Sequence, residues 1–220
     1  MARKKEIGKK KILAIAYKMV VKDGIESLTA RNIAKAGHFS TQPLYLEFES
    51  MDELRNEVLH QIADNLRSNI LQKQYTSEPM VDMDLSYIEF AEQHENLFRA
   101  MFVDGKFGSK VISDTLIELG ILKFKEQYPD DSHTNEKIKN IVIANWITTI
   151  GIASLIVNGI ASFSQTQIVN VLSAQLNDAV INDWLSETST VSLFDTEDVK
   201  EARAKKKKII KNNFLIKSHI

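Results

Sequence analysis

Apolar residues recur at intervals of three and four over most of the chain, which is the spacing of amphipathic α-helices. The first run predicts a helix over about residues 6–23, with apolar positions at Ile12, Leu13, Ala16, Met19 and Val20. Gly24 follows this run and suits the left-handed position just past a helix end, so that Ile25 can fold back on Val20 as in a Schellman cap. The chain is therefore expected to open with one long helix that stops sharply.

Two short helices are predicted next, over about residues 30–36 and 41–47. Thr29 is a good N-cap for the first of them, and Gly37 is expected to end it. Ser40 is the expected N-cap of the second. Apolar residues flank both caps at the positions of a hydrophobic staple, Leu28 with Ile33 and Phe39 with Leu44.

A proline shapes the start of the second short helix. Pro43 falls on its third residue, where a missing N–H is tolerated, and Ser40 must then cap the backbone N–H of Gln42. After this helix, Ser50 and Glu53 form an S-x-x-E capping box. The box predicts the start of a fourth helix.

The remaining apolar runs predict that the rest of the protein is helical as well. The fourth helix is expected to reach about residue 72, and one or two helices follow over residues 80–104. Three further helices are predicted over residues 107–127, 135–160 and 165–187. No charged residue occurs between Asn140 and Asn177, so the last two helices have apolar or neutral side chains nearly all round.

A membrane span is one interpretation of this uncharged region, because residues 141–157 are long and apolar enough to raise it. Asn145, Thr148, Thr149 and Ser154 interrupt the segment, and neither flank is strongly basic. A helix that is apolar nearly all round is also typical of one that is buried on both faces. One face would pack on its own subunit and the other on a partner, which explains both uncharged helices together.

The composition agrees with a helical globular protein. Of the 220 residues, 44% are hydrophobic and 26% are charged, which excludes global disorder. Eight glycines and three prolines lie below the usual shares of roughly 7% and 5%, which disfavours turn-rich β folds. The absence of cysteine excludes disulfides, thiol catalysis and zinc sites built on cysteine.

The net charge of −1 hides an uneven distribution. Residues 1–41 carry ten Lys and Arg against three Asp and Glu, whereas residues 42–200 carry eleven against twenty-five. Residues 201–220 carry seven against one. A basic head on an acidic body predicts a polyanion-binding module attached to a second function.

The arrangement of the first three helices indicates which polyanion is bound. Two short helices joined by a three-residue turn, with a basic helix before them, make a helix-turn-helix. The second short helix begins with Ser40, Thr41 and Gln42, whose hydroxyls and amide can reach base edges in the major groove of DNA. The surrounding Lys and Arg side chains can neutralise phosphates. The alternative is a small helical bundle with a solvated basic face.

Residues 28–54 resemble the N-terminal domain of the TetR/AcrR family of bacterial transcription regulators. The similarity is carried at fixed spacings by Leu28-Thr29, Ile33-Ala34, Phe39-Ser40, Leu44-Tyr45, Phe48 and Asp52-Glu53-Leu54. The resemblance implies that Thr29 and Arg31 approach phosphates or the groove edge and that the Tyr45 hydroxyl bonds a phosphate. It places Leu44 and Phe48 in the core, and the major groove is then faced by Ser40, Thr41, Gln42 and Pro43.

Two positions depart from this family pattern. His38 stands where the family usually has glycine, so the backbone there is less tightly turned or His38 adds a DNA contact. Met51 stands near the start of the fourth helix, where the family usually has lysine, which removes one expected phosphate contact. The N-terminus of that helix can still bind a phosphate through its amides.

The C-terminal region resembles, more distantly, a subtype of the family that carries a Trp-x-x-x-His-Gly motif. The matching stretch runs from Trp146 to Gly151, but Ile150 occupies the histidine position. The loss of that polar contact favours a largely apolar effector. The family dimerises through its last two long helices, and the residues that this implies for the interface are Ile147, Ile150, Leu155, Ile168, Leu172, Leu176 and Val180.

The family resemblance also implies a ligand pocket among the helices of the body. The residues expected to line it are Phe90, His94, Phe98, Phe102, Phe124, Asn145, Trp146 and Thr149. For each aromatic residue the alternative is ordinary core packing, and for His94 it is a solvated helix face. Asn145 and Thr149 lie one helical turn apart, so they can satisfy each other or backbone carbonyls, or they can orient a ligand.

No feature of the sequence supports an enzyme, because it has neither a glycine-rich phosphate loop nor a G-x-S-x-G motif. The five histidines, at 38, 60, 94, 133 and 219, lack metal-ligand spacing, so no metal or other cofactor is expected. The basic tail, about residues 196–220, is expected to be solvated and partly disordered. The alternatives are a short helix packed on the body and an extra contact with DNA or a membrane surface.

These observations predict an all-α protein with an N-terminal three-helix helix-turn-helix DNA-binding domain and a C-terminal helical ligand-binding and dimerisation domain. The expected divisions are residues 1–50, a connecting helix in 51–75, the body in 76–195 and the tail in 196–220. The predicted function is that of a cytoplasmic homodimeric regulator, most often a repressor, which binds a near-palindromic double-stranded DNA operator and is released by a small-molecule effector. The alternatives are a protein-interaction adaptor without DNA binding and a regulator tethered to a membrane through residues 141–157.

Overall fold

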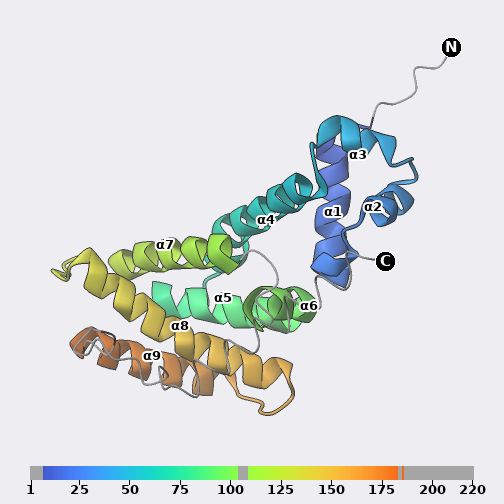
Figure 1. The fold of residues 1–220 in the computed structure, drawn as a ribbon. Helices are drawn as coiled ribbons and strands as arrows, with labels where there is room; N and C mark the ends of the chain where they lie inside the picture. The colour runs from blue at the N-terminus through green and yellow to red at the C-terminus, as the bar shows by residue number, and fades with distance from the viewer. Residues whose placement is uncertain (1–6, 104–108, 183–184, 186–220) are drawn as a thin grey trace, which may run out of the picture. The chain divides into compact units, whose positions relative to one another are not determined.

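The structure, a computed structural model, describes residues 7–103, 109–182 and 185, and these residues contain helices and turns but no strand. The all-α fold class is therefore confirmed (Figure 1). The first four helices are α1 (Lys9–Asp23), α2 (Ala30–Gly37), α3 (Gln42–Glu47) and α4 (Met51–Ser68). The later helices are α5 (Pro79–Gln93), α6 (Glu95–Phe98), α7 (Ser109–Gln127), α8 (Asn135–Val157) and α9 (Gln165–Ile181).

Short helical turns complete the path of the chain. A 3₁₀ turn, η1 (Ile25–Ser27), lies between α1 and α2, and a second, η2 (Ile70–Gln72), follows α4. A π-helical segment, η3 (Arg99–Val103), continues α6. All of these elements belong to one compact unit, residues 1–185. The predicted basic tail lies outside the described residues.

The N-terminal helices share a core in which α1 packs against α2, α3 and α4. The helical spacing of the apolar residues explains this packing, because each helix turns its apolar stripe inward. The fully buried side chains include Ile12, Val20, Leu28, Ile33, Leu44 and Leu54. We call α1, α2 and α3 the reading head, and the helices from α5 to α9 the body.

The predicted N-caps of α2 and α4 are present, whereas the Schellman cap predicted for α1 is not formed. Gly24 has φ 78° but ψ 172°, outside the left-handed helical region, and although its N–H donates to the Val20 carbonyl at 2.9 Å, no backbone bond runs from Ile25 back to the helix within the described residues. The Thr29 hydroxyl accepts the Asn32 N–H at 3.2 Å, and the Ser50 hydroxyl accepts the Glu53 N–H at 3.1 Å. The other half of the predicted capping box is different, because the Glu53 carboxylate accepts the N–H of Glu49 at 2.6 Å instead of that of Ser50.

The cap predicted for α3 is wrong. The helix begins at Gln42 with Thr41 as the N-cap residue, and neither Thr41 nor Ser40 makes a side-chain capping bond. Pro43 is consequently the second helical residue and not the third. Thr41 has helical dihedral angles, φ −71° and ψ −15°, and not the extended ones with which a capping residue reaches the N–H groups of the first turn.

Several helix ends also differ from the predicted ones. The first helix begins at Lys9 because Gly8 is extended, and α4 ends at Ser68 before the separate turn η2. Helix α8 ends at Val157, since Gly159 has φ 65° and its N–H bonds the Ile156 carbonyl. Helix α9 ends at Ile181, short of the predicted residue 187, part of which stretch lies outside the described residues.

Helix α5 is the centre of the body and packs against α7, α8 and α9. It is buried on nearly every side, including two acidic residues, Asp82 and Asp84. Asp82 holds the loop before the helix, because its carboxylate accepts the backbone N–H groups of Tyr75 and Thr76 at 3.0 and 2.7 Å. Asp84 instead faces α8, as described below.

Helix α8 is long and apolar enough to cross a membrane by length and composition, with a mean hydropathy of 1.8. In this fold its polar residues Asn145 and Thr149 are buried and hydrogen-bonded to Asp84. The helix packs against α5, α7 and α9. Its inner face therefore belongs to a protein core with polar partners of its own.

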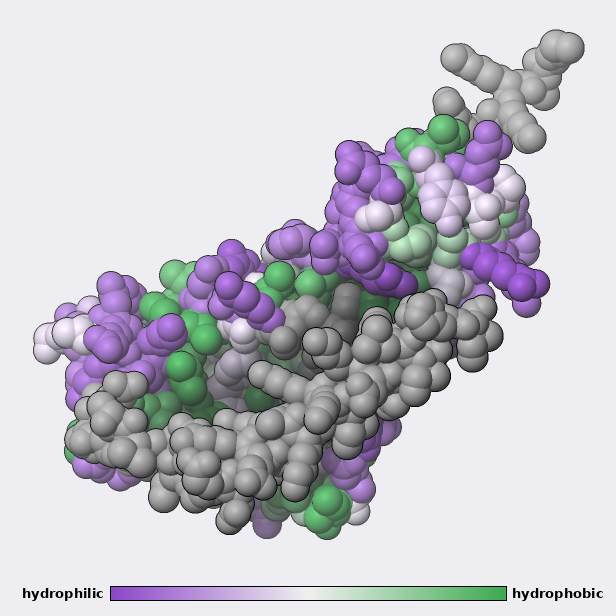
Figure 2. All heavy atoms as spheres, in the orientation of Figure 1, coloured by the Kyte–Doolittle hydropathy of each residue, from purple (hydrophilic) through white to green (hydrophobic). Residues whose placement is uncertain are grey.

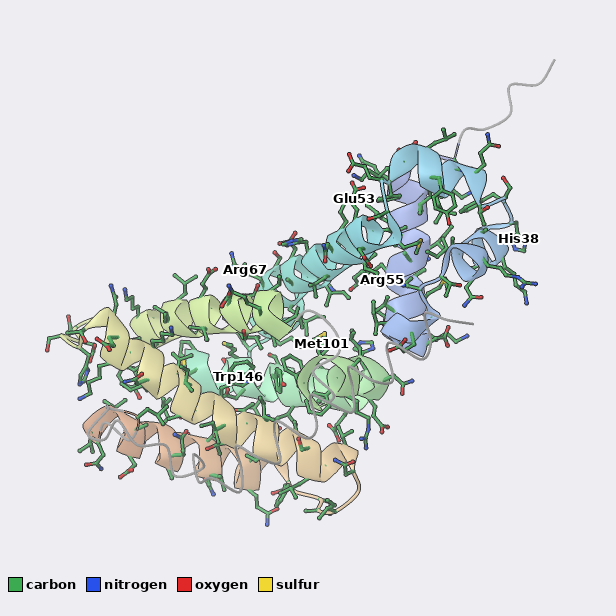
Figure 3. All side chains as sticks on the ribbon, in the orientation of Figure 1. His38, Glu53, Arg55, Arg67, Met101 and Trp146 are labelled. Atoms are coloured by element: carbon green, nitrogen blue, oxygen red, sulfur yellow. The ribbon has the colours of Figure 1, made fainter. Side chains whose placement is uncertain are left out.

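The reading head meets the body at two places. Helix α6 contacts α1, where the Asn96 side-chain amide donates to the Lys22 carbonyl at 3.3 Å. Helix α4 contacts α7, where Arg67 pairs with Glu118 (Figure 3). These contacts connect the C-terminal end of α1 to α6 and connect α4 to α7.

Candidate functional site

The turn between α2 and α3 fixes how α3 is presented. His38 adopts the left-handed conformation, φ 56° and ψ 44°, and it lies at the outer end of α2 (Figure 3). The Phe39 N–H donates to the Ala34 carbonyl at 3.0 Å, which closes the turn. The residue that takes the left-handed position is therefore His38 and not Gly37. The turn keeps the tight geometry of a glycine, which corrects the expectation of a looser backbone.

Gly37 contributes to this turn in another way. A Cβ atom at this position would lie 2.0 Å from the Phe39 ring and 2.8 Å from the Ile15 Cδ1 atom, so a side chain here would displace the turn from α1. The absence of a side chain lets α2 approach α1 closely. The orientation of α3 therefore depends on Gly37 and on His38.

The structure separates the residues of α2 and α3 into an outer and an inner set. Leu44 and Phe48 are buried, as the resemblance implied, and Pro43 is half-buried. The exposed residues among those predicted to contact DNA are Thr29, Arg31, His38, Ser40, Thr41, Gln42 and Tyr45. Leu46, 77% exposed, lies on the same short helix and was missed by sequence reasoning. We call these exposed residues of α2 and α3, together with Leu46, the reading face.

The basic side chains around the reading face differ in whether they are already paired with acidic residues. Lys9 forms ion pairs with Glu53 and Glu57 of α4, and its ammonium lies 5.1 Å from the centre of the Phe48 ring. It therefore ties α1 to α4. Hydrophilic residues cover α4 and much of the visible face of α1–α3 (Figure 2). The exposed basic residues of the head include Lys10, Lys11, Lys18, Arg31 and Lys35.

A small cavity lies between α5, α7 and α8 in the body. Its free volume is about 20 Å³, room for about one water molecule. Most of its wall is apolar, and its polar lining consists of Asp84, Tyr87, Asn145 and Thr149 together with the Trp146 indole. Gly120 of α7 lets α8 approach, because a Cβ atom there would lie 2.5 Å from Val142.

Asp84 is the polar centre of this cavity. It is 4% exposed and its Oδ2 atom accepts the Asn145 side-chain N–H at 2.7 Å. Its Oδ1 atom lies 2.9 Å from the Thr149 hydroxyl. Burial raises the pKa of Asp84 to about 7, although the hydrogen bonds from Asn145 and Thr149 offset part of the rise.

The bonding pattern is complete when Asp84 is a neutral acid. The Thr149 hydroxyl also lies 3.1 Å from the Asn145 backbone carbonyl, and a hydroxyl has only one hydrogen to donate. If Asp84 donates its own proton to Thr149, Thr149 donates to that carbonyl, and the hydrogens of Asp84 and Thr149 both have an acceptor. When Asp84 is ionised, the single Thr149 hydrogen must serve two acceptors. The neutral form therefore matches the geometry, in agreement with the raised pKa.

Aromatic rings form the neighbouring wall. Tyr87 packs edge-on against Phe98 and Phe102, and Phe102 packs edge-on against Trp146, with ring centres 5.2–6.2 Å apart. Burial raises the pKa of Tyr87, and the nearby Trp146 N–H offsets part of this rise. The Tyr87 hydroxyl and the Trp146 N–H nevertheless have no partner within hydrogen-bond geometry. Trp146 also lines an open hollow of about 330 Å³, so it contributes to both the hollow and the cavity.

The residues predicted to line a ligand pocket are distributed over several places. Asn145, Trp146 and Thr149 line the cavity, and Phe102 lines the outer hollow with Met101, Lys110, Ser113, Trp146 and Ile150. The structure does not place Phe90, Phe98, Phe124 or His94 in the wall of either. Phe90, Phe98 and Phe124 are buried core residues. His94 packs on Phe90 at the end of α5, where burial lowers its pKa.

Asp84 and Tyr87 also line the cavity but were not among the residues predicted to line a ligand pocket. The available signal was the stretch from Met80 to Tyr87, in which two acids alternate with apolar residues. A helix with apolar residues on all sides is buried, and acids on such a helix must then be buried with it.

The residues predicted for a dimer interface also divide into two groups. Ile147 is 62% exposed and Leu155 is 37% exposed, and Ile150 and Val180 are half-buried. Ile168, Leu172 and Leu176 are buried within their own subunit, so their assignment to the interface was wrong. They are covered because α9 turns this stripe toward α8 and α5. The outer face of α9 instead presents Val171 and Ile181.

Solved structures share this arrangement of helices. A TetR-family transcriptional regulator from Streptomyces coelicolor aligns with a TM-score of 0.59 and 15% identity over 77% of each chain. A TetR-like transcriptional regulator from Rhodococcus sp. RHA1 aligns with a TM-score of 0.51 and 18% identity, over 82% of this chain and 99% of that one. The chain has the TetR-type fold. No protein-family model and no curated protein matches its sequence.

Within the TetR-type fold, the segment from α1 to α3 is the helix-turn-helix and α5–α9 form the helical C-terminal domain. At 15–18% identity the comparison concerns the fold.

Proposed function

We propose that the protein is a DNA-binding transcription regulator that acts as a homodimer and responds to a small molecule. The observation that carries this proposal is the reading face, in which hydroxyl, amide and phenol groups point outward from α2 and α3 while Leu44 and Phe48 anchor α3 in the core. Such a face is suited to hydrogen bonds with base edges and phosphates.

Each residue of the reading face has a role that follows from its chemistry. Gln42 at the start of α3 can bond adenine through its amide, since Gln matches the N6 and N7 edge. Tyr45 can donate its hydroxyl to a phosphate. Thr29 already accepts the Asn32 N–H, and its hydroxyl hydrogen stays available for a phosphate. The guanidinium of Arg31 supplies charge at the groove edge.

Dimerisation would use the outer faces of α8 and α9. Ile147, Gly151 and Leu155 follow one another at four-residue intervals on α8 and are exposed. A Cβ atom at Gly151 would meet no atom within 4 Å, so no contact within the described part of the subunit requires a glycine there. Glycine inside a helix costs roughly 0.5–1 kcal/mol relative to alanine. Close approach of a partner helix would explain why it is present.

The ligand response would begin at the cavity and its aromatic wall. Phe102 belongs to η3, which continues α6, and α6 contacts the base of α1. A ligand that prefers one arrangement of these helices shifts the spacing of the two reading heads, with a typical coupling of about 1–3 kcal/mol. Release of the operator by such a ligand would make the protein a repressor.

DNA binding can be tested by fluorescence anisotropy with the DNA upstream of the protein's own gene. We expect the anisotropy of the labelled DNA to rise on binding at low salt and to fall again when the same DNA is added unlabelled. The affinity should decrease steeply as the salt concentration rises. The combined change Gln42→Ala and Tyr45→Phe should weaken specific binding at least tenfold. The matched control is Gln74→Ala with Tyr75→Phe, because these exposed residues precede α5 and lie outside the reading face.

The control pair should bind DNA as the unchanged protein does. If the reading-face pair also binds with unchanged affinity, α3 is not the element that reads the operator. If no DNA from the upstream region binds at low salt, the proposed function is wrong and a role as a protein-interaction adaptor gains support.

A further inference from the structure

Asp84 is a buried acid with no ionic partner among the described residues. The closest polar groups are the side chains of Asn145 and Thr149, both neutral, and no Lys, Arg or His forms an ion pair with it in this part of the chain. Burial of an ionised carboxylate is costly unless a cation or several hydrogen bonds accompany it. Within the described residues, Asp84 lacks that cation.

Three buried polar atoms of residues that line the cavity with Asp84 lack a hydrogen-bond partner, and two of them, Asn145 Oδ1 and the Tyr87 oxygen, can accept a hydrogen bond, whereas the Trp146 N–H can only donate one. Asn145 is 2% exposed, and its Oδ1 atom has no hydrogen-bond partner. The Tyr87 oxygen, also buried and without a partner, can accept a hydrogen bond as well. A ligand group that carries several hydrogens on one atom can donate to Asp84 and to more than one of these oxygens. An ammonium group, with three donors and a positive charge, has this property.

The surrounding rings suit the rest of such a ligand. Tyr87 and Trp146 line the cavity, and Phe102 packs against both of them. Aromatic faces attract cations and bury alkyl chains. Trp146 lines both the cavity and the hollow that Phe102 and Met101 also line, so this side chain is the one through which the proposed ligand would connect the two spaces; Figure 3 labels Trp146 on α8 and Met101.

We propose that the body binds a lipophilic primary ammonium ion, with Asp84 as its counter-ion, Asn145 Oδ1 and the Tyr87 oxygen as further acceptors, and the alkyl part in the hollow beyond Trp146. This proposal names the chemical class of the small molecule in the proposed function, and a regulatory role for the ligand rests on that proposed function. It modifies the expectation of a largely apolar effector, because it adds one positive charge to an apolar body. Lys110 is the charged side chain that lines the hollow, and it disfavours a second positive charge on the ligand.

Binding of a cation must be linked to the proton on Asp84. The groups that face Asp84 are Tyr87 on its own helix and Asn145, Trp146 and Thr149 on α8, and Met80, Met83, Leu116, Gly120 and Val142 complete the lining. Among these, Asp84 is the group that titrates near neutral pH, since the pKa of Tyr87 is raised above its ordinary alkaline value. Ammonium binding should therefore release the proton of the neutral acid.

The experiment uses alkylammonium ions with four to ten carbons, each compared with the primary alcohol of the same length. Isothermal titration calorimetry in two buffers of different ionisation enthalpy gives both the affinity and the number of protons released. With a pKa of about 7 for Asp84, release should approach about 0.9 proton at pH 6 and about 0.1 at pH 8. The affinity for the ammonium ion should rise about tenfold over the same range.

The variant Asp84→Asn keeps the shape and removes the charge. We expect it to lose the preference for the ammonium ion over the alcohol and the release of protons, while Asp114→Asn, a matched change at an exposed position of α7, keeps both. If Asp84→Asn does not fold, the proton release of the unchanged protein still decides. Equal binding of ammonium ion and alcohol, binding without proton release at pH 6, or no binding of any member of the series would each overturn the proposal.

DNA binding is measured separately, so the two proposals can fail independently. Loss of ammonium recognition with intact DNA binding would refute the ligand class alone. Ammonium recognition by a protein that binds no DNA would refute the proposed function alone.

Discussion

The buried acid in the body predicts an unusual dependence of stability on pH. In the unfolded chain the Asp84 carboxyl has an ordinary pKa near 3.9, whereas burial raises it to about 7 in the folded protein. Between these values the folded protein holds a proton that the unfolded chain has lost. The contribution of this residue to stability is therefore greatest below about pH 4 and declines as the pH rises toward 7.

The size of the effect follows from the difference in pKa. A shift of about three units at 1.36 kcal/mol per unit corresponds to about 4 kcal/mol lost between pH 4 and pH 8. Asp84→Asn removes this dependence, because the amide is neutral at every pH. Its oxygen can accept from Asn145 and its N–H can donate to Thr149, in the pattern of the neutral acid, while a second N–H without a partner costs roughly 1–3 kcal/mol.

Urea denaturation followed by far-ultraviolet circular dichroism tests the prediction. The free energy of unfolding is measured at half-unit steps from pH 5 to pH 8 for the unchanged protein and for Asp84→Asn. Since all other titrating groups are shared, the difference between the two isolates residue 84. The unchanged protein should lose stability relative to the variant by about 1.4 kcal/mol per pH unit below pH 7, and the difference should level off above it.

A difference that stays flat over this range would refute the reasoning, because it would mean that residue 84 does not change its protonation near neutral pH. A difference that grows in the opposite direction would show a carboxylate stabilised by an unseen cation. The control Asp114→Asn, at an exposed site, should show no such trend.

Two further predictions concern the backbone and the subunit contact. His38→Gly should raise the free energy of unfolding by up to about 1 kcal/mol in thermal or urea denaturation, because it relieves a left-handed conformation at a residue with a side chain; a less stable variant would contradict the strain assigned to the turn. Gly151→Phe should convert the proposed dimer to a monomer in sedimentation velocity, since the ring would occupy the space that a partner helix needs, whereas Ser113→Phe, at the hollow on α7, should leave the proposed dimer intact. An unchanged sedimentation coefficient for Gly151→Phe would place the interface elsewhere.

The parts of the fold that depend on neighbours in sequence were predictable. Thr29 and Ser50 cap their helices as expected because a cap needs only a side chain and an N–H three residues ahead. The cap of α3 failed for the same local reason, since Ser40 and Thr41 are both plausible caps and the choice depends on one pair of dihedral angles. The end of α2 was misplaced by one position, because Gly37 is its last helical residue and His38 takes the left-handed cap position.

The parts that depend on three-dimensional packing were harder to predict. The uncharged sequence of α9 does not reveal which stripe faces its own subunit, and Ile168, Leu172 and Leu176 face inward. The cavity was found only in part, because Asn145 and Thr149 meet Asp84 across 61 and 65 residues of chain. No periodicity within one helix indicates such a partner.

The short stretch formed by α6 and η3 has a consequence for how motion travels. At one end, Asn96 is bound to the last turn of α1, and at the other, Phe102 forms part of the wall beside Trp146. Between them Arg99 is bonded to Asn158 at the end of α8. Single π-helical turns are rare and occur frequently at functional sites, and this one links the aromatic wall beside Trp146 to the last turn of α1, so a displacement of the Phe102 ring would act on a segment that is bonded to both α1 and α8.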